Sequence, residues 1–147
     1  MKTLSPKLIL VCVISSALFT SCLKEDISHK TTLLIQHSWK FEMYGLDENN
    51  NGVIEASENN MQPCEEDDRF TFMVSGSGFF ERNKLQCSLI EPDIINFNWS
   101  FYNNETELAI FAAPEKISRL DDYVLEVYYM DVNSVGQPVK YIRRFSH

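Results

Sequence analysis

The segment with the clearest chemistry is residues 47–58, which reads Asp-Glu-Asn-Asn-Asn-Gly-Val-Ile-Glu-Ala-Ser-Glu. It matches the calcium-loop pattern D-x-[DN]-x-[DN]-G-x5-E at every specified position. In such a loop, oxygens at positions 1, 3, 5, 7, 9 and 12 surround one hard cation, and the glycine at position 6 permits the sharp turn. The predicted ligands are Asp47, Asn49, Asn51, the main-chain carbonyl of Val53, Glu55 and Glu58.

The surroundings of this motif leave two interpretations open. A strand pattern precedes it and a poor helix former follows at 59–63, so the helix pair of an EF-hand is not expected. Two ligands are neutral Asn, which predicts weak calcium binding, with a Kd of about 10⁻⁴–10⁻³ M. Residues 47–68 hold eight acidic and no basic side chains, and their repulsion favours a bound cation. The alternative is a solvated loop that binds nothing.

The N-terminal residues have the pattern of an export signal. Two lysines, a short apolar run at 8–19 and small residues precede Cys22. The run is too short to cross a bilayer, which needs about 20 apolar residues. Phe19-Thr20-Ser21-Cys22 resembles the lipobox of bacterial lipoproteins. The resemblance implies that residues 1–21 are a cleaved signal peptide and that Cys22 is lipidated, which makes the membrane a partner through the lipid.

The residues that follow Cys22 resemble a sorting signal. Leu23-Lys24-Glu25-Asp26 follows directly after the lipid attachment site and resembles the surface-export signal of Bacteroidetes-type lipoproteins. An ordinary solvated tether over residues 22–32 is the alternative. With the lipobox, this pattern predicts an outer membrane lipoprotein that is exposed on the surface.

The remaining cysteines fit an exported chain. Cys12 lies in the predicted signal peptide and Cys22 takes the lipid, which leaves Cys64 and Cys87. An even pair in an oxidising compartment predicts a disulfide, and two cysteines without a nearby histidine do not make a zinc site.

Composition and missing motifs limit the function classes. The chain has 147 residues with 21 acidic and 13 basic side chains, and this balance argues against a nucleic acid partner. It contains no G-x-S-x-G, no H-E-x-x-H and no glycine-rich phosphate loop, so we expect no enzymatic activity. The acidic pairs Glu65-Glu66 and Asp121-Asp122 could serve acid–base chemistry, but capping of turns is the alternative.

The elements that must position these residues are strands. Apolar and polar residues alternate around Trp39, around Phe70 and from Ile95 to Tyr102, which is the period of a half-buried strand. Further strands are expected at 78–85, 106–112, 115–120, 123–132 and 138–145, with a hairpin turn at 75–78 and a short helix at 27–36. About eight antiparallel strands joined by short links predict an all-β, up-and-down barrel or a curled meander.

The order of these features resembles the lipocalin-like domain lipoproteins of Bacteroidetes-type bacteria, over about residues 33–147. The resemblance rests on His37-Ser38-Trp39-Lys40, the acidic loop, Cys64 before Arg69-Phe-Thr-Phe72, and Asn98-Trp-Ser-Phe101 before Thr106-Glu-Leu108. His37 stands where lipocalins carry the glycine of Gly-x-Trp. The resemblance implies an eight-stranded barrel with a cell-envelope role and no known ligand.

Two functions remain open for such a barrel. The first is a binding or interaction domain for an envelope protein, stiffened by calcium at 47–58. The alternative is a carrier of a small apolar ligand in the lumen, because an eight-stranded barrel either fills itself with side chains or holds one such ligand.

Overall fold

The computed structural model describes residues 27–88, 90, 92–111 and 113–147. The predicted signal peptide (1–21) and Cys22 lie outside the described residues. In chain order the elements are α1 (His29–Ile35), β1 (Ser38–Leu46), η1 (Pro63–Glu65), β2 (Arg69–Phe72), β3 (Ser77–Glu81), β4 (Ile94–Tyr102), β5 (Glu107–Ile110), β6 (Pro114–Leu120), β7 (Val124–Val132) and β8 (Pro138–Ser146). None of the helices in the described part of the chain is long and apolar enough to span a membrane.

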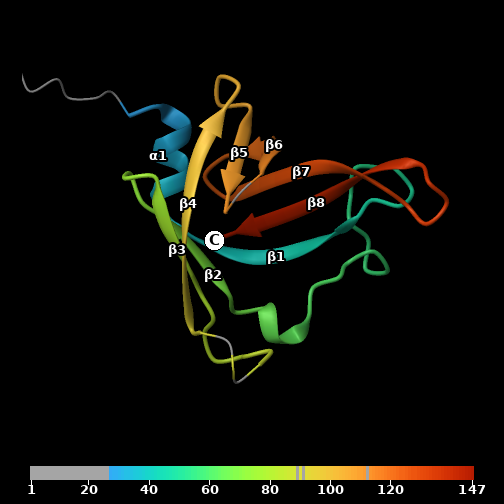
Figure 1. Ribbon diagram of the computed structural model, residues 1–147, viewed down its shortest axis with the longest axis horizontal. Helices are drawn as coiled ribbons and strands as arrows, with labels where there is room; N and C mark the ends of the chain where they lie inside the picture. Colours follow the sequence, from blue (N-terminus) through green and yellow to red (C-terminus); the bar gives the residue numbers. More distant parts are fainter. Residues whose placement is uncertain (1–26, 89, 91, 112) are drawn as a thin grey trace, which may run out of the picture.

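The eight strands form a closed barrel (Figure 1). Each strand pairs antiparallel with the next one along the chain, and β8 pairs with β1 to close the cylinder. Closure gives every described strand a neighbour on each side, which removes most of the surface on which aggregation by edge pairing would start. The prediction of an all-β chain with about eight antiparallel strands and a short N-terminal helix is confirmed.

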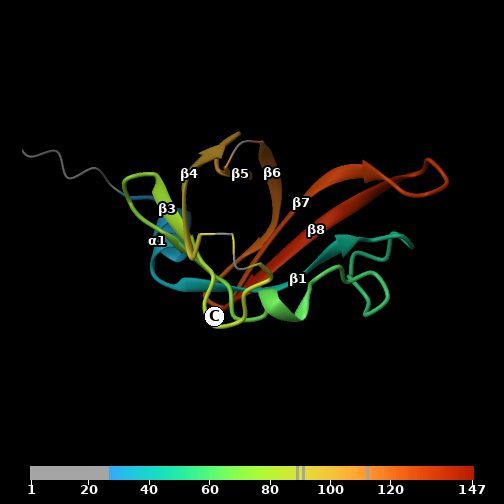
Figure 2. The same ribbon diagram turned by 60° about the horizontal axis from the view of Figure 1, so that its bottom comes forward.

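This topology gives the barrel two different ends. Because every connection reverses the chain direction, the links β1–β2, β3–β4, β5–β6 and β7–β8 lie at one end, called here the open end. The links β2–β3, β4–β5 and β6–β7 lie at the other, called the closed end. Figure 2 shows α1 on one side of the molecule and the β7–β8 hairpin far away on the opposite side.

Helix α1 covers the closed end. It begins after Ser28, whose side chain accepts a hydrogen bond from the Thr31 main-chain N–H at 3.1 Å, and such a cap stabilises a short helix. Its Lys30 donates to the carbonyl of Glu105 in the β4–β5 link, at 2.5 Å. The Trp39 indole donates to the carbonyl of Leu34 at 2.8 Å, which joins the end of the helix to the first strand.

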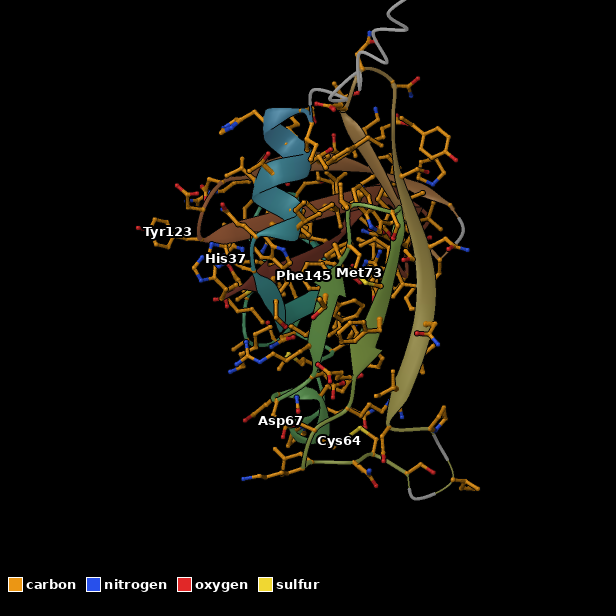
Figure 3. The ribbon with its side chains drawn as sticks, turned by 90° about the vertical axis from the view of Figure 1, so that its left-hand side faces the viewer. His37, Cys64, Asp67, Met73, Tyr123 and Phe145 are labelled. Carbon is orange, nitrogen blue, oxygen red and sulfur yellow. A yellow bond between two sulfur atoms is a disulfide. The ribbon has the colours of Figure 1, made fainter. Side chains whose placement is uncertain are left out.

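The core follows from alternation along the strands. In β4, Phe97 and Trp99 are buried while Asn96, Asn98 and Ser100 are exposed, so one face of the strand points into the barrel. The same pattern on the other strands collects one cluster of buried side chains: Leu34, Trp39, Phe70, Phe72, Phe80, Phe97, Trp99, Leu108, Ile110, Leu125, Val127 and Phe145. Phe145 lies inside the barrel in Figure 3.

The predicted disulfide is present. Cys64 of η1 and Cys87 of the β3–β4 link are bonded, with their Cα atoms 5.1 Å apart. Figure 3 places Cys64 at the end of the molecule away from α1. The bond therefore ties two loops of the open end together.

Some predicted boundaries are wrong by a few residues. The hairpin turn expected at 75–78 lies instead at 73–76, where the Gly76 N–H donates to the Met73 carbonyl at 3.0 Å and Gly76 has a φ of 79°, a conformation that glycine adopts readily. Gly78 belongs to β3 and pairs with Phe97, and β3 ends at Glu81 rather than at residue 85. The sequence alone does not show which of the two glycines, Gly76 or Gly78, lies in the turn and which lies in the strand. The register between the paired strands decides this.

Candidate functional site at the open end

The side chains on the inner wall of the barrel change from apolar to polar and aromatic toward the open end. Register places Tyr44 beside Arg143 on β1 and β8, and Tyr129 beside Tyr141 on β7 and β8. Arg143 also pairs with Val127, a core residue, so this set of positions faces the lumen. Polar and aromatic side chains therefore continue the inward-facing rows beyond the apolar core.

An ion pair lies where the apolar core meets this polar region. Arg143 contacts the carboxylate of Glu115 on β6 at 2.7 Å, and both side chains are mostly buried. A buried carboxylate needs such a partner, because an unpaired charge is costly away from water.

Three tyrosines form a row across β7, β8 and β1. The rings of Tyr129 and Tyr141 stack with centroids 5.0 Å apart, and Tyr141 lies 6.2 Å from Tyr44. The Tyr44 hydroxyl donates to the Glu65 carboxylate of η1 at 2.9 Å. Tyr129 is 39% exposed, so the row reaches from the interior to solvent.

These tyrosines stay neutral. Burial, together with the hydrogen bond to Glu65 and its negative charge, raises the pKa of Tyr44 to about 12. Burial also raises the pKa values of Tyr129 and Tyr141 above their ordinary value. The row can therefore offer aromatic faces and neutral hydroxyls to a bound group, but not phenolate charge.

Asp68 is a buried acid at the open end. It is only 3% exposed, and its Oδ1 has no hydrogen-bond partner among the described residues. Its carbonyl accepts from the Phe41 N–H at 3.3 Å, which places it directly across from Phe41 at the edge of the β1–β2 pairing. Burial raises the pKa of Asp68 to about 6, against the opposing charge of Arg82 and with smaller contributions from Glu65 and Asp67.

The structure brings most of the predicted calcium-loop side chains together through hydrogen bonds. Asp47 is buried, and its two carboxylate oxygens accept from the main-chain N–H groups of Asn51 (2.9 Å) and Gly52 (2.8 Å). The Asn49 side-chain oxygen also accepts from the Asn51 N–H, at 2.9 Å. The Asn51 side chain accepts from the Val53 N–H at 2.8 Å and donates to Glu55 at 3.0 Å.

Glu58 closes this loop. One of its oxygens accepts from the Glu48 N–H at 2.9 Å and the other from the Glu55 N–H at 3.0 Å. The Val53 side chain is exposed. Across the described ranges, no group of three or more His, Cys, Asp or Glu side chains is arranged to hold a metal ion. Calcium binding at 47–58 stays a prediction.

The loop also folds back against the outside of the barrel, which the sequence did not reveal. The Asp47 N–H donates to the carbonyl of Lys140 on β8 at 2.8 Å, and the Asn60 N–H donates to the carbonyl of Tyr44 at 2.8 Å. Ile54 is buried beside Gly45. The acidic loop is therefore a fixed part of the open end, next to the tyrosine row.

At least one acid of each pair singled out in the sequence has a structural partner. Asp121 accepts from the main-chain N–H groups of Tyr123 and Val124, both at 2.9 Å, and caps the β6–β7 turn. These hydrogen bonds and the neighbouring Arg119 lower the pKa of Asp121. Glu65 accepts from Tyr44 and from the Gln62 N–H, which caps η1.

Several residues of this site were missed by sequence reasoning. Glu115, Arg143, Tyr129 and Tyr141 are polar or amphipathic residues at inward positions of predicted strands, and that position was the signal that could have found them. Tyr44 carried no such signal, because simple alternation from Trp39 places it on the outer face of the strand, and a register shift between Phe41 and Met43 turns it inward. No family model matches the chain, and neither a curated protein nor a solved structure matches it. The resemblance to lipocalin-like lipoproteins therefore remains part of the proposal that follows.

Proposed function

We propose that this chain is a cell-envelope lipoprotein with a lipocalin-like binding domain, and that the open end of the barrel holds the partner. The observation that carries the proposal is that the barrel interior has an apolar half and a polar, aromatic half. Apolar side chains fill the closed half, whereas the inner wall of the open end carries the tyrosine row, the Arg143–Glu115 pair and Asp68. Partly exposed aromatic rings beside charged groups are typical of a recognition surface.

The same packing argues against the apolar carrier. A carrier needs an empty apolar lumen, but the buried cluster draws on α1 and on all strands except β6, and it contains two tryptophans and five phenylalanines. Of the two hollows that we describe, one of about 580 Å³ is open and lies between Asp67, Arg69, Asn83 and Lys84. The other, of about 230 Å³, lies over β3 and β4. This arrangement favours recognition at the rim of the barrel.

The proposed anchor gives the barrel an orientation. The predicted tether of 22–32 is shortened at its end, because residues 29–32 belong to α1; a lipid on Cys22 would therefore be joined by a short link to α1, which covers the closed end. The membrane then lies on the side of the closed end, and the open end faces away from it. This orientation suits a domain that binds a partner outside the outer membrane.

In this proposal calcium stiffens the loop beside the open end. Asp47, Asn49, Asn51, the Val53 carbonyl, Glu55 and Glu58 would hold the ion. The side-chain oxygens of these residues keep lone pairs that could bind the ion, although they accept hydrogen bonds from main-chain N–H groups. A carboxylate offers about four lone-pair sites and an amide oxygen two. The motif and the eight acidic residues of 47–68 support this part. We propose binding rather than catalysis, since no catalytic motif occurs in the sequence.

Site-specific photo-cross-linking on intact cells tests the proposal. A benzophenone amino acid replaces Tyr129 at the open end or, as the control, Tyr123 at the closed end, which is 68% exposed. We expect a defined cross-linked product from position 129 and none from position 123. Products of equal yield from both positions, or none from position 129, would contradict recognition at the open end.

A further inference from the structure

The outer part of β7 has a neighbouring strand on one side only. Its pairing with β6 ends at Tyr128, which lies opposite Lys116, whereas its pairing with β8 continues to Val132, which lies opposite Pro138. Figure 2 shows the outer ends of β7 and β8 projecting away from β6. Within the described ranges, residues 129–132 therefore form a strand edge that no other strand covers.

The main-chain groups of Met130 point out of this edge. Met130 lies opposite Lys140 of β8, and the Lys140 carbonyl accepts from the Asp47 N–H on the far side of β8, at 2.8 Å. Opposite residues of an antiparallel pair direct their main-chain groups either toward each other or away from each other. The N–H and the C=O of Met130 therefore point away from β8, into the space beyond the end of the β6 pairing.

Val132 repeats this arrangement two residues further along β7. It lies opposite Pro138, whose carbonyl accepts from the Asn50 side chain at 3.2 Å on the far side of β8. The Val132 N–H donates to the Asp131 side chain at 2.8 Å, so its carbonyl is the group left for pairing. Met130 and Val132 together offer one N–H and two C=O groups at the spacing of a strand ladder, and such groups are a template for another strand.

The side chains along the same edge are apolar and exposed. Met130 is 56% exposed and Val132 is 59% exposed. Between them lies the exposed acid Asp131, and before them lies Tyr129 of the tyrosine row. Exposed apolar side chains beside unpaired main-chain groups are typical of a binding surface, because an added strand covers both.

The occupant of this edge is an extended polypeptide, because main-chain groups at strand spacing pair with the main chain of another strand. A second copy of this chain is disfavoured by charge. Residues 47–68 hold eight acidic and no basic side chains and lie against β8, one strand away from the edge, so that two paired copies would bring these segments together. The same charge, together with Asp131, favours a partner segment with basic side chains.

We propose that the outer edge of β7 binds an extended segment of a partner protein by strand addition, with main-chain hydrogen bonds to Met130 and Val132. The segment carries apolar side chains at every second position and basic side chains among the others. The inference rests on the proposed function, since it names the kind of partner that the open end recognises and the way in which this partner binds.

A synthetic peptide in which valine alternates with lysine tests this with the purified full chain in detergent. The same peptide, N-methylated at every second residue, keeps its side chains but cannot pair through its main chain. Calorimetry measures the affinity of each. We expect saturable binding of the plain peptide and binding weaker by about tenfold or more for the N-methylated form.

Met130→Pro removes the main-chain donor of the edge. Proline is tolerated on an edge strand where the N–H faces solvent, so the hairpin should still form, and a thermal melt shows whether the variant is folded. We expect its affinity for the plain peptide to fall by about tenfold or more. Met130→Leu keeps the N–H and an apolar side chain, and its affinity should stay within about threefold of wild type.

Hydrogen exchange of the wild-type chain gives a second readout that needs no variant. The Met130 amide should exchange rapidly in the free chain, and the plain peptide should slow this exchange by about tenfold or more. The Asp131 amide is the internal control. It points toward β8, because main-chain direction alternates along a strand, and it should be protected with and without the peptide.

Equal affinity for both peptides, equal affinity of wild type and folded Met130→Pro, or no binding at millimolar concentration overturns the inference. So does a dimer, measured by sedimentation, that Met130→Pro dissociates, because the occupant is then a second copy. On intact cells, a cross-link from position 129 that persists in Met130→Pro would leave the proposed function standing without strand addition. Absence of that cross-link from the chain with Met130 would contradict the proposed function itself.

Discussion

At the scale of single residues, Gly45 marks the place where two main-chain segments come closest. A Cβ atom at this position would lie 1.9 Å from the carbonyl oxygen of Glu58. The main chain of the acidic loop runs directly over β1 here and forms a bridge between Gly45 and Asn59. The absence of a side chain at Gly45 therefore allows the loop to pack on the barrel.

We expect Gly45→Ala to lower the free energy of unfolding by about 1–3 kcal/mol, because the loop must move away from β1. Guanidinium titration followed by tryptophan fluorescence measures the change. Ser57→Ala, an exposed substitution in the same loop, should stay within about 0.5 kcal/mol of wild type. Equal midpoints for Gly45→Ala and wild type would show that the loop does not pack as described.

Asp68 makes a prediction about pH. Its folded pKa of about 6 lies above its ordinary value of 3.8, so the folded chain holds this proton more tightly than the unfolded chain. The contribution to stability is therefore complete below about pH 4 and is lost as pH rises through 6. At neutral pH the buried carboxylate destabilises the fold.

Asp68→Asn removes this titration. We expect the variant to exceed wild type in stability by about 1–2 kcal/mol at pH 8, a value reduced by screening from Arg82 and solvent, and to lose that advantage toward pH 4. Thermal melts across this pH range measure the difference. Glu66→Gln should show no comparable trend, and a pH-independent difference for Asp68→Asn would refute the assignment.

At the scale of elements, the loop 47–58 already has an ordered hydrogen-bond network without a bound ion. Calcium binding to the folded chain must nevertheless raise its melting temperature if the predicted ligands hold the ion. For a Kd of about 1 mM, tenfold excess calcium contributes about 1.4 kcal/mol, or a few degrees.

A thermal melt with calcium and with chelator measures this shift. Glu58→Gln removes the predicted ligand of position 12 and should abolish the shift, whereas Glu66→Gln lies outside the motif and should preserve it. Absence of a shift in wild type at millimolar calcium would remove the metal from the proposal and leave the hydrogen-bonded loop.

The disulfide acts on the elements of the open end. Its loop of 24 residues, counted from Cys64 to Cys87, stabilises the fold by about 3.5 kcal/mol in the chain-entropy description. We expect reduction to lower the guanidinium midpoint accordingly. The Cys64→Ser/Cys87→Ser variant should match the reduced protein and should not respond to reductant, and a midpoint unaffected by reduction would contradict this role.

At the scale of the whole molecule, the proposed lipid decides where the barrel resides. Cys22→Ser should abolish labelling with radioactive palmitate and release the protein from the membrane fraction, because two or more acyl chains are needed for stable anchoring. Cys12→Ser lies in the predicted signal peptide and should leave labelling intact. Palmitate incorporation into Cys22→Ser would place the lipid elsewhere.

The sequence by itself determined the class of fold and the disulfide. Alternation around Trp39, Phe70 and Trp99 requires strands with one buried face, and sequential strands with short links close most simply into a barrel. Turn positions were less certain, as Gly76 and Gly78 show, because both glycines suit a turn and only strand register separates them.

Only the tertiary structure decided the site. Tyr44 and Tyr141 are far apart in the chain, and they meet because barrel closure brings β8 beside β1. In the same way Asp68 comes to lie across from Phe41 because β1 pairs with β2. The polarity of a residue shows which face of a strand it prefers, but not which inward-facing residues of other strands stand next to it. That pairing depends on the register between strands, which is a property of the folded cylinder and not of any segment alone.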